Sequence, residues 1–251
     1  MDSIFSRRTA LVIGGSGGIG KAISLALARE GAHIIVHGGS SQERLDQTLQ
    51  DIQNIQGAAG ITTADQCHRA LLKPLKGPES VTELLEQVPK TDILVISFGP
   101  FLRKPLTQLE ANDWDYMTKM NLAFPGALVS AYLDQMLSQQ WGRILLFGGT
   151  NTESIRGFLT TTAYAAAKTG LGVLAKSVAR IGGAVNVTCN VICPGMIDTE
   201  YLTEQDRRYA REKAPGGTLI ASETIANMAV EILKQPHLNG ALIPVDNGLV
   251  I

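Results

Sequence analysis

Short apolar segments alternate along this chain with longer amphipathic ones. The apolar segments predict β-strands at residues 9–13, 33–37, 91–96, 143–147, 186–192 and 241–245, with a weaker strand at 57–63. The amphipathic segments predict helices at residues 21–30, 43–55, 109–140 and 164–181. Several of the strands are apolar without interruption, which is typical of a sheet covered on both faces. This alternation, with no linker or repeat, predicts one α/β domain over residues 1–251, with helices on both faces of a parallel sheet.

Composition narrows the class of protein. The chain has 251 residues, 45% of them hydrophobic, and its mean hydropathy is +0.10, so a large core is feasible and disorder is disfavoured. A formal net charge of -1 gives no reason to expect nucleic acid or an anionic membrane as a partner. No leader is recognisable, and no apolar run approaches the ~20 residues that span a bilayer. We therefore expect a cytoplasmic protein.

The cysteines favour neither a disulfide framework nor a metal site. Cys67, Cys189 and Cys193 form an odd and scattered set. Cys189 and Cys193 flank an apolar run and have no second pair of ligands nearby, so buried thiols are expected and no metal is.

A glycine-rich turn joins the first predicted strand to the first helix. Glycines at such a junction allow positive φ and let the backbone approach a pyrophosphate, which the helix N-terminus stabilises. The spacing is wider than in the ordinary dinucleotide pattern, and an unspecific glycine turn is the alternative. The turn consists of Gly14, Gly15, Ser16, Gly17, Gly18, Ile19 and Gly20.

Tyr164 and Lys168 lie four residues apart on a predicted alanine-rich helix. Their side chains therefore share one helical face. A neighbouring ammonium favours the phenolate and lowers the tyrosine pKa, as general acid/base catalysis requires. Taken alone, such a pair is more often part of a helix surface.

Further motifs make the chain similar to the short-chain dehydrogenase/reductase family over nearly its whole length, and to 3-oxoacyl-carrier-protein reductases within it. They are Asn121 after the fourth strand, Pro194-Gly195 after the sixth, and a Val-Asp-Asn-Gly ending at residues 245–248. The resemblance implies a Rossmann-type, doubly wound parallel sheet. It also implies hydride transfer between a nicotinamide cofactor and a carbonyl or alcohol substrate.

The resemblance assigns roles to individual residues. Tyr164 would exchange the proton with the substrate oxygen, Lys168 would lower its pKa and hold the ribose, and Asn121 would order a water that links Lys168 to solvent. An ordinary loop at Pro194-Gly195 and a helix cap at Asn121 are the alternatives. The other cofactor contacts implied are Gly99, Pro194, Gly195, Ile197 and Thr199, and, for the adenine amino group, Asp65.

The family's catalytic serine has no clear counterpart. Counting back from the tyrosine points to Asn151, whereas counting along the fifth strand points to Gly149. Thr150 lies between them and has the hydroxyl that the role needs, so we favour it. Thr152 and Ser154 are the fallbacks, and the absence of any such hydroxyl is the remaining alternative.

Residues 96–99 (Ile-Ser-Phe-Gly) replace the family's Asn-Asn-Ala-Gly. Gly99 keeps the close approach of the backbone to the cofactor, but the asparagine amides are missing. Either Ser97 replaces part of their hydrogen bonding or this edge is more apolar.

The end of the second strand favours NADP over NAD. NAD enzymes place a carboxylate there for the ribose hydroxyl, and this chain has Gly38 instead. Ser40 and Ser41 are expected to donate to a 2′-phosphate, with His37 and Arg44 as assisting candidates. Against NADP stand the lack of an arginine at the usual neighbouring positions and a glycine at position 17.

Residues 200–219 are expected to form the substrate loop, closing as a lid. The expected substrate is a small carbonyl or alcohol, with a carrier-bound acyl thioester as a candidate for the loop's basic cluster; a solvated helix face is the alternative. The resemblance suggests a homodimer or homotetramer. A non-catalytic nucleotide-binding protein is the alternative function, which retention of Tyr164, Lys168 and Asn121 disfavours.

Overall fold

A seven-stranded parallel sheet forms the centre of the molecule. The computed structural model describes residues 3–58 and 68–249. The strands are ordered β3-β2-β1-β4-β5-β6-β9. Their bounds are β1 Thr9–Ile13, β2 His33–Gly38, β3 Arg69–Leu72, β4 Ile93–Ile96, β5 Gly142–Phe147, β6 Val187–Pro194 and β9 Leu242–Val245. The order reverses between β1 and β4, where the carboxyl ends of the strands form the crevice in which such sheets bind ligands.

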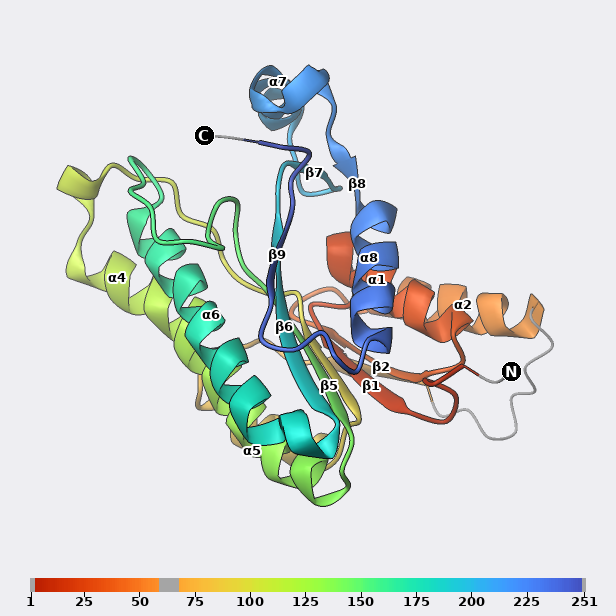
Figure 1. Cartoon of the computed structure of the whole chain (residues 1–251). Helices are drawn as coiled ribbons and strands as arrows, with labels where there is room; N and C mark the ends of the chain where they lie inside the picture. The colour runs from red at the N-terminus through yellow and green to blue at the C-terminus, as the bar shows by residue number, and fades with distance from the viewer. Residues whose placement is uncertain (1–2, 59–67, 250–251) are drawn as a thin grey trace.

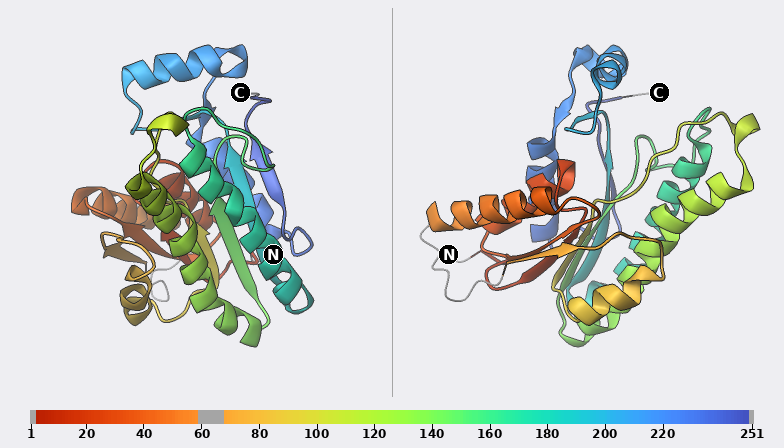
Figure 2. Two further views of the ribbon diagram at one scale, coloured as in Figure 1. Left: turned by 90° about the vertical axis from the view of Figure 1, so that its left-hand side faces the viewer. Right: turned by 180° about the vertical axis from the view of Figure 1, so that it is seen from behind.

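Helices cover both faces of the sheet (Figures 1 and 2). One layer contains α1 (Gly18–Arg29), α2 (Gln42–Ala58) and α8 (Ser222–Lys234); the other contains α3 (Ser80–Gln87), α4 (Ala111–Thr118), α5 (Phe124–Ser138) and α6 (Thr162–Gly182). A separate hydrophobic core lies between the sheet and each helical layer, and successive strand residues point into opposite cores. In β1, Ala10 and Val12 pack against the first layer, and Leu11 and Ile13 pack against the second. The doubly wound α/β fold predicted from the sequence is confirmed.

A small unit stands at the carboxyl end of the sheet, apart from both helical layers (Figure 2). It consists of β7 (Ile197–Asp198), α7 (Glu204–Lys213) and β8 (Ile220–Ala221), and β7 pairs in parallel with β8. Thr203 caps α7 through a reciprocal capping box with Asp206. The predicted substrate loop therefore contains a capped helix of its own.

The structure corrects two of the predicted elements and adds two helices to them. The predicted strand at 57–63 begins inside α2, whose last turn is anchored by the buried Gln56 amide donating to Ala28 and Ala32; residues 59–67 lie outside the described part. The edge strand is β3 instead. The helix predicted at 109–140 is divided by a π-helical turn, Lys119–Ala123, between α4 and α5. Helices α3 and α8 were not predicted, although Ile225, Ala229 and Leu233 recur at helical spacing.

Candidate active site

The glycine turn lies at the carboxyl end of β1 and packs closely on the strand beside it. Gly14 and Gly18 have φ values of +78° and +48°, which disfavour residues with a Cβ. A Cβ on Gly20 would overlap the Gly14 carbonyl and the Ser97 Oγ. The Ser97 hydroxyl donates to the Ile13 carbonyl at 2.8 Å, so this serine ties the end of β4 to the end of β1.

His37 supports the turn from behind. The side chain is buried, its Nδ1 accepts from the Gly14 N–H at 3.4 Å, and its Nε2 lies 2.8 Å from the Lys73 carbonyl oxygen. Burial lowers the pKa of His37 to about 4, so the ring is neutral at pH 7. A buried neutral imidazole with both nitrogens occupied holds backbone rather than a phosphate.

Tyr164 and Lys168 lie on the face of α6 that is turned toward the sheet. The Lys168 ammonium donates to the Phe147 carbonyl at the end of β5, at 2.8 Å, and lies 5.9 Å from the centroid of the Tyr164 ring. Lys168 is only 4% exposed. The pair is therefore part of a buried site and not of a helix surface.

Burial dominates the protonation of this pair. It raises the pKa of Tyr164, and the neighbouring Cys193 thiol adds to that rise. It lowers the pKa of Lys168 to about 8. The sequence predicted a lowered tyrosine pKa, and in this structure the pKa is raised instead, because burial removes the phenolate from water. The phenol is in its protonated form at neutral pH.

Asn121 faces Lys168 from the π-helical turn. Its Nδ2 donates to the Pro100 carbonyl at 3.0 Å, while its Oδ1 is buried without a hydrogen-bond partner. A Cβ on Gly99 would overlap this Oδ1 and lie 2.9 Å from the Lys168 Nζ. The structure thus brings Asn121, Lys168 and the Gly99 backbone together at one point.

Gly149 lies against the Tyr164 phenol, and the three candidate hydroxyls are hydrogen-bonded to other groups. A Cβ on Gly149 would be 3.0 Å from the Tyr164 hydroxyl. The Thr150 hydroxyl donates to the Pro194 carbonyl at 3.0 Å, and Thr152 bonds to the Gly149 backbone. Ser154 is exposed beside Arg156. Among the described residues no hydrogen bond joins these hydroxyls to the phenol, and Gly149, the position given by the count along the fifth strand, is in contact with it.

The segment after β6 forms the opposite wall of the crevice. Gly195 lies directly against Asp246, since a Cβ there would be 2.7 Å from the Asp246 Cα. Ile197 is half-buried in β7, and the Thr199 carbonyl accepts from Arg207 at 2.9 Å. The Pro-Gly and Asp-Asn-Gly motifs, far apart in sequence, therefore support each other.

At the other end of the crevice, the end of β2 packs on the glycine turn. A Cβ on Gly38 would lie 2.7 Å from the Ser16 Oγ and 2.9 Å from Leu45. Packing therefore leaves little room for an acidic side chain at this position. The Ser41 Oγ accepts from the Arg44 backbone N–H at 3.2 Å, and Ser40 is exposed. Asp65 lies outside the described residues.

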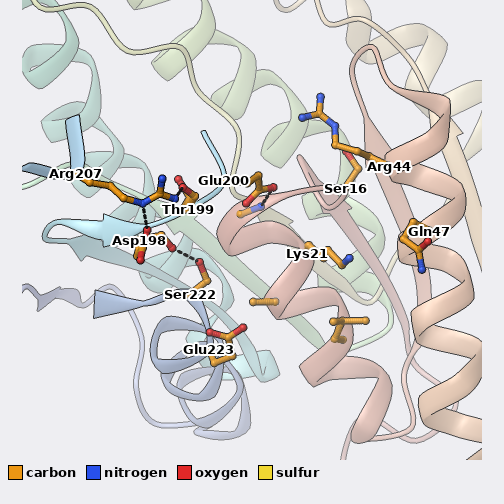
Figure 3. A pocket seen from close by; sticks show the side chains of 13 residues that line it. Ser16, Lys21, Arg44, Gln47, Asp198, Thr199, Glu200, Arg207, Ser222 and Glu223 are labelled. Carbon is orange, nitrogen blue, oxygen red and sulfur yellow. Dashed lines mark hydrogen bonds and ion pairs between the residues drawn. The ribbon is translucent and has the colours of Figure 1, made fainter. Parts of the chain in front are cut away.

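Ser16 and Arg44 also line a cavity of about 630 Å³ between α1, α2 and the segment that follows β7 (Figure 3). Across it, the Glu200 carboxylate accepts from the Gly18 N–H at 2.8 Å. The Arg44 guanidinium lies 5.5 Å from the Tyr201 ring centroid. Nothing in the sequence links Glu200 and Tyr201 to the glycine turn, because only the fold brings them together.

Aromatic and basic side chains form the mouth of the crevice above Tyr164. Phe101 packs edge-on against the Tyr164 ring with 5.1 Å between centroids. The Arg103 guanidinium lies 5.8 Å from the Phe101 ring and 4.7 Å from the ring of Tyr209 on α7. The small unit containing α7 is thus in contact with the catalytic end as well as with the glycine turn.

Comparisons with known proteins match the chain to the family that its sequence motifs resemble. The family model described as short chain dehydrogenase matches residues 8–210. The 3-oxoacyl-(acyl-carrier-protein) reductase FabG of Pseudomonas aeruginosa is 30% identical, with 96% of this chain and 97% of that protein covered. The uncharacterized oxidoreductase YvaG of Bacillus subtilis is 29% identical over 97% and 96%.

Solved structures agree with these relatives. A 3-oxoacyl (acyl-carrier-protein) reductase from Agrobacterium tumefaciens with NADP bound is 28% identical and superposes with a TM-score of 0.84, covering 97% of this chain and 95% of that one. A blue fluorescent protein from a metagenomic library in complex with NADPH is 26% identical, with a TM-score of 0.81 over 98% and 99%. Within the described residues, no helix has both the length and the apolar character needed to cross a membrane.

Proposed function

The chain belongs to the short-chain dehydrogenase family and is an oxidoreductase of that family, and from this premise we propose that it reduces a carbonyl substrate with NADPH. One observation carries the proposal: the half-buried Tyr164, the buried Lys168 and the unpartnered Asn121 Oδ1 converge at the crevice next to the glycine turn. A protein that only binds nucleotides has no need of such a group of residues.

The residues present fit a dinucleotide cofactor. The glycine turn presents backbone N–H groups at the N-terminus of α1, which favours a diphosphate. The Lys168 ammonium and the Thr199 segment line the same crevice and would hold the ribose and the carboxamide of the nicotinamide half. When bound, the cofactor supplies the hydride. Gly14, Ser16, Gly17, Gly18, Ile19, Gly20, Gly99, Pro194, Gly195, Ile197 and Thr199 are the proposed contacts.

Tyr164 is the proposed proton donor. Its phenol is held protonated by burial, as donation to the carbonyl oxygen of a substrate requires, although the same burial makes it a weaker acid than an exposed tyrosine. Lys168 has its pKa lowered to about 8, so it exchanges a proton near neutral pH and can return one to the phenol. The free Oδ1 of Asn121 can accept from a water that connects Lys168 to solvent.

A hydroxyl that polarises the carbonyl is the least supported part of the site. Thr150 keeps its acceptor capacity while it donates to Pro194, and it stays the proposed residue. Gly149 leaves room beside the phenol, so a site that works with Tyr164 alone as donor is the competing form of the mechanism.

NADPH is favoured over NADH by the end of β2. Gly38 offers no carboxylate that would repel a 2′-phosphate. Ser16, Ser41 and Arg44 supply hydroxyls and a guanidinium near this point. Two structural neighbours were solved with NADP and NADPH, respectively, which supports the same choice.

The substrate proposed for testing is a 3-oxoacyl thioester, since several relatives are named as 3-oxoacyl-carrier-protein reductases. Phe101 supplies an apolar surface beside Tyr164 for an acyl chain, and Arg103 supplies a positive charge further out. A homo-oligomer in the cytoplasm is proposed from the same family relationship.

The deciding experiment is a panel of 3-oxoacyl thioesters, simple ketones and alcohols followed at the nicotinamide absorbance, with NADPH and NADH side by side. We expect turnover of at least one carbonyl class with preference for NADPH. Tyr164→Phe should lose turnover by about 10²- to 10⁴-fold while still binding NADPH, because only the proton donor is removed. Unchanged turnover in this variant would refute the mechanism, and saturable binding of NADPH without turnover of any class would refute the function.

A further inference from the structure

The phosphate-binding end of the crevice is in contact with a side chain of the protein itself. Glu200 follows β7, and its Oε1 accepts from the backbone N–H of Gly18 in the first turn of α1 at 2.8 Å (Figure 3). The next residue, Tyr201, places its hydroxyl so close to Gly17 that a Cβ there would overlap it. Glu200 and Tyr201, which we call the plug, are separated from the glycine turn by more than 180 positions in sequence.

The chemistry of the contact is that of an anion at a helix N-terminus. The first turn of an α-helix has free N–H groups and a partial positive charge, and it attracts carboxylates and phosphates alike. Gly17 and Gly18 belong to the turn that the proposed dinucleotide needs for its diphosphate, so the carboxylate and the diphosphate require the same donor and the same space.

We propose that the plug is an internal competitor of the cofactor: Glu200 occupies the diphosphate position in the cofactor-free protein and must leave it when a dinucleotide binds. The inference rests on the proposed function, because it assumes that the glycine turn binds a nicotinamide dinucleotide.

The contacts around the plug show what moves with it. Arg207 donates to Asp198, Thr199 and Leu202 at 2.9, 2.9 and 3.0 Å, so the start of the small unit is braced internally. Toward the glycine turn, in contrast, the plug is exposed, and Tyr201 is 57% accessible. The contact between the plug and the glycine turn is therefore expected to break first. The segment from Asp198 to α7 is held together by Arg207 and is expected to move as one rigid body.

Release of the plug also affects two other places. The Arg44 guanidinium, which lies over the Tyr201 ring, becomes free to face a 2′-phosphate. In the middle of α7, Tyr209 contacts Arg103, which in turn contacts Phe101 beside Tyr164. Displacement of the plug thus couples cofactor binding to the mouth of the substrate crevice, and the cofactor is expected to bind before the substrate.

The test compares Glu200→Gln with Glu204→Gln by titration of each variant and of the wild type with NADPH in the absence of substrate. Gln keeps the size of the side chain and removes its charge. Glu204 lies on the same small unit, is exposed, and has Arg211 at 3.8 Å as its partner, so its variant is the matched control. Because a carboxylate at an exposed helix N-terminus is a modest stabiliser, we expect Glu200→Gln to bind NADPH about two- to fivefold more tightly than the wild type, and Glu204→Gln to match the wild type.

Hydrogen exchange supplies a readout that does not depend on the cofactor. In the cofactor-free protein, the backbone amides of the first turn of α1 and of residues 199–213 should exchange faster in Glu200→Gln than in the control, because the contact that protects both is weakened.

The outcomes separate this inference from the proposed function. If the wild type binds NADPH and Glu200→Gln binds it equally or more weakly, the plug is not a competitor and only this inference falls. If Glu200→Gln and Glu204→Gln tighten NADPH binding to the same extent, the cause is the loss of one negative charge anywhere on the small unit, and the inference is refuted as well. If no variant binds NADPH or NADH, the proposed function falls together with it.

Discussion

The two ends of the crevice are built in opposite ways. At the catalytic end, Lys168 and Asn121 are buried and tied to backbone carbonyls of Phe147 and Pro100. At the phosphate end, the front of the glycine turn faces exposed side chains, and its contact partner Glu200 comes from a separate small unit.

This difference indicates where the protein is preorganised. Groups that exchange a proton must be held in place before the substrate arrives, and burial fixes both their geometry and their pKa values. A binding end that must admit and release a cofactor gains from weak, exposed contacts. The following variants test whether the two ends really differ in this way.

The largest effect is expected from Lys168→Met at the catalytic end. Loss of the ammonium removes the partner of Tyr164, and kcat should fall by about 10²- to 10⁴-fold in steady-state assays with NADPH. A decrease of less than tenfold would show that the buried cation is not needed for proton exchange.

The same variant is also expected to change how the free energy of unfolding depends on pH. The pKa of Lys168 is about 8 in the folded protein and 10.5 ordinarily. Between these values the unfolded chain holds a proton that the folded protein lacks, so this group makes the free energy of unfolding rise with pH, by up to about 3 kcal/mol in total. Denaturant unfolding should therefore show this rise between pH 8 and 10.5 for the wild type relative to Lys168→Met, and parallel curves would contradict the burial of the charge.

The next effect concerns His37, the buried part of the phosphate end. Its pKa is about 4 in the folded protein against an ordinary 6.5. Between pH 6.5 and 4 the unfolded chain binds a proton on this histidine and the folded protein does not. The contribution of His37 to the free energy of unfolding is therefore complete above pH 6.5 and decreases as the pH falls, by up to about 3 kcal/mol.

The difference between the wild type and His37→Gln in chemical denaturation should thus shrink on acidification, because the glutamine has nothing to titrate. The exposed His237→Gln is the control and should follow the wild type. A constant difference from pH 7 to 4 would mean that His37 is not held neutral.

A smaller effect is expected where the catalytic end lacks a hydroxyl. Gly149→Ala puts a methyl group 2.7 Å from the edge of the Tyr164 ring and should lower kcat, whereas Gly149→Ser adds a hydroxyl next to the phenol. We expect the serine variant to exceed the alanine variant by about tenfold in kcat, since a donor at the developing oxyanion stabilises the transition state. Equal rates, together with a reduced rate in Thr150→Ala, would assign the role to Thr150.

The smallest effect is expected from Ser97→Ala, at the boundary between the two ends. Its hydroxyl donates to the Ile13 carbonyl, so the loss should cost about 1 kcal/mol in the free energy of unfolding. Turnover should change little, because Gly99 and Asn121 keep their places. A large loss of turnover would show that this hydroxyl orients the cofactor site and does more than support the sheet.

The catalytic end could be predicted from the sequence, and the phosphate end only in part. Strand β1 was predicted with the bounds that it has, and Tyr164, Lys168 and Asn121 belong to motifs with fixed spacing along regular elements. The serine position was ambiguous because the loop before α6 is longer than in the family, so counting from either side gave different residues.

What the sequence could not show is contact between distant segments. Nothing near Glu200 marks it as a partner of Gly18, since the contact depends on where β7 leaves the sheet relative to α1. His37 was an assisting candidate for the 2′-phosphate because it stands at the end of the second strand, with a structural histidine as the alternative, and the fold buries it under the glycine turn.

The π-helical turn between α4 and α5 contains the one extra residue of this long helical segment. Its hydrogen bonds join residues five apart and not four, so Lys119–Ala123 holds one residue more than an α-helical turn would. Helix α4 packs on α6, and α5 packs on β5. Deletion of one residue from this stretch is therefore expected to restore a regular α-helical turn and to leave both contacts in place, while it displaces Asn121 from Lys168. A change of length at this one place would separate the geometry of the site from the stability of the fold.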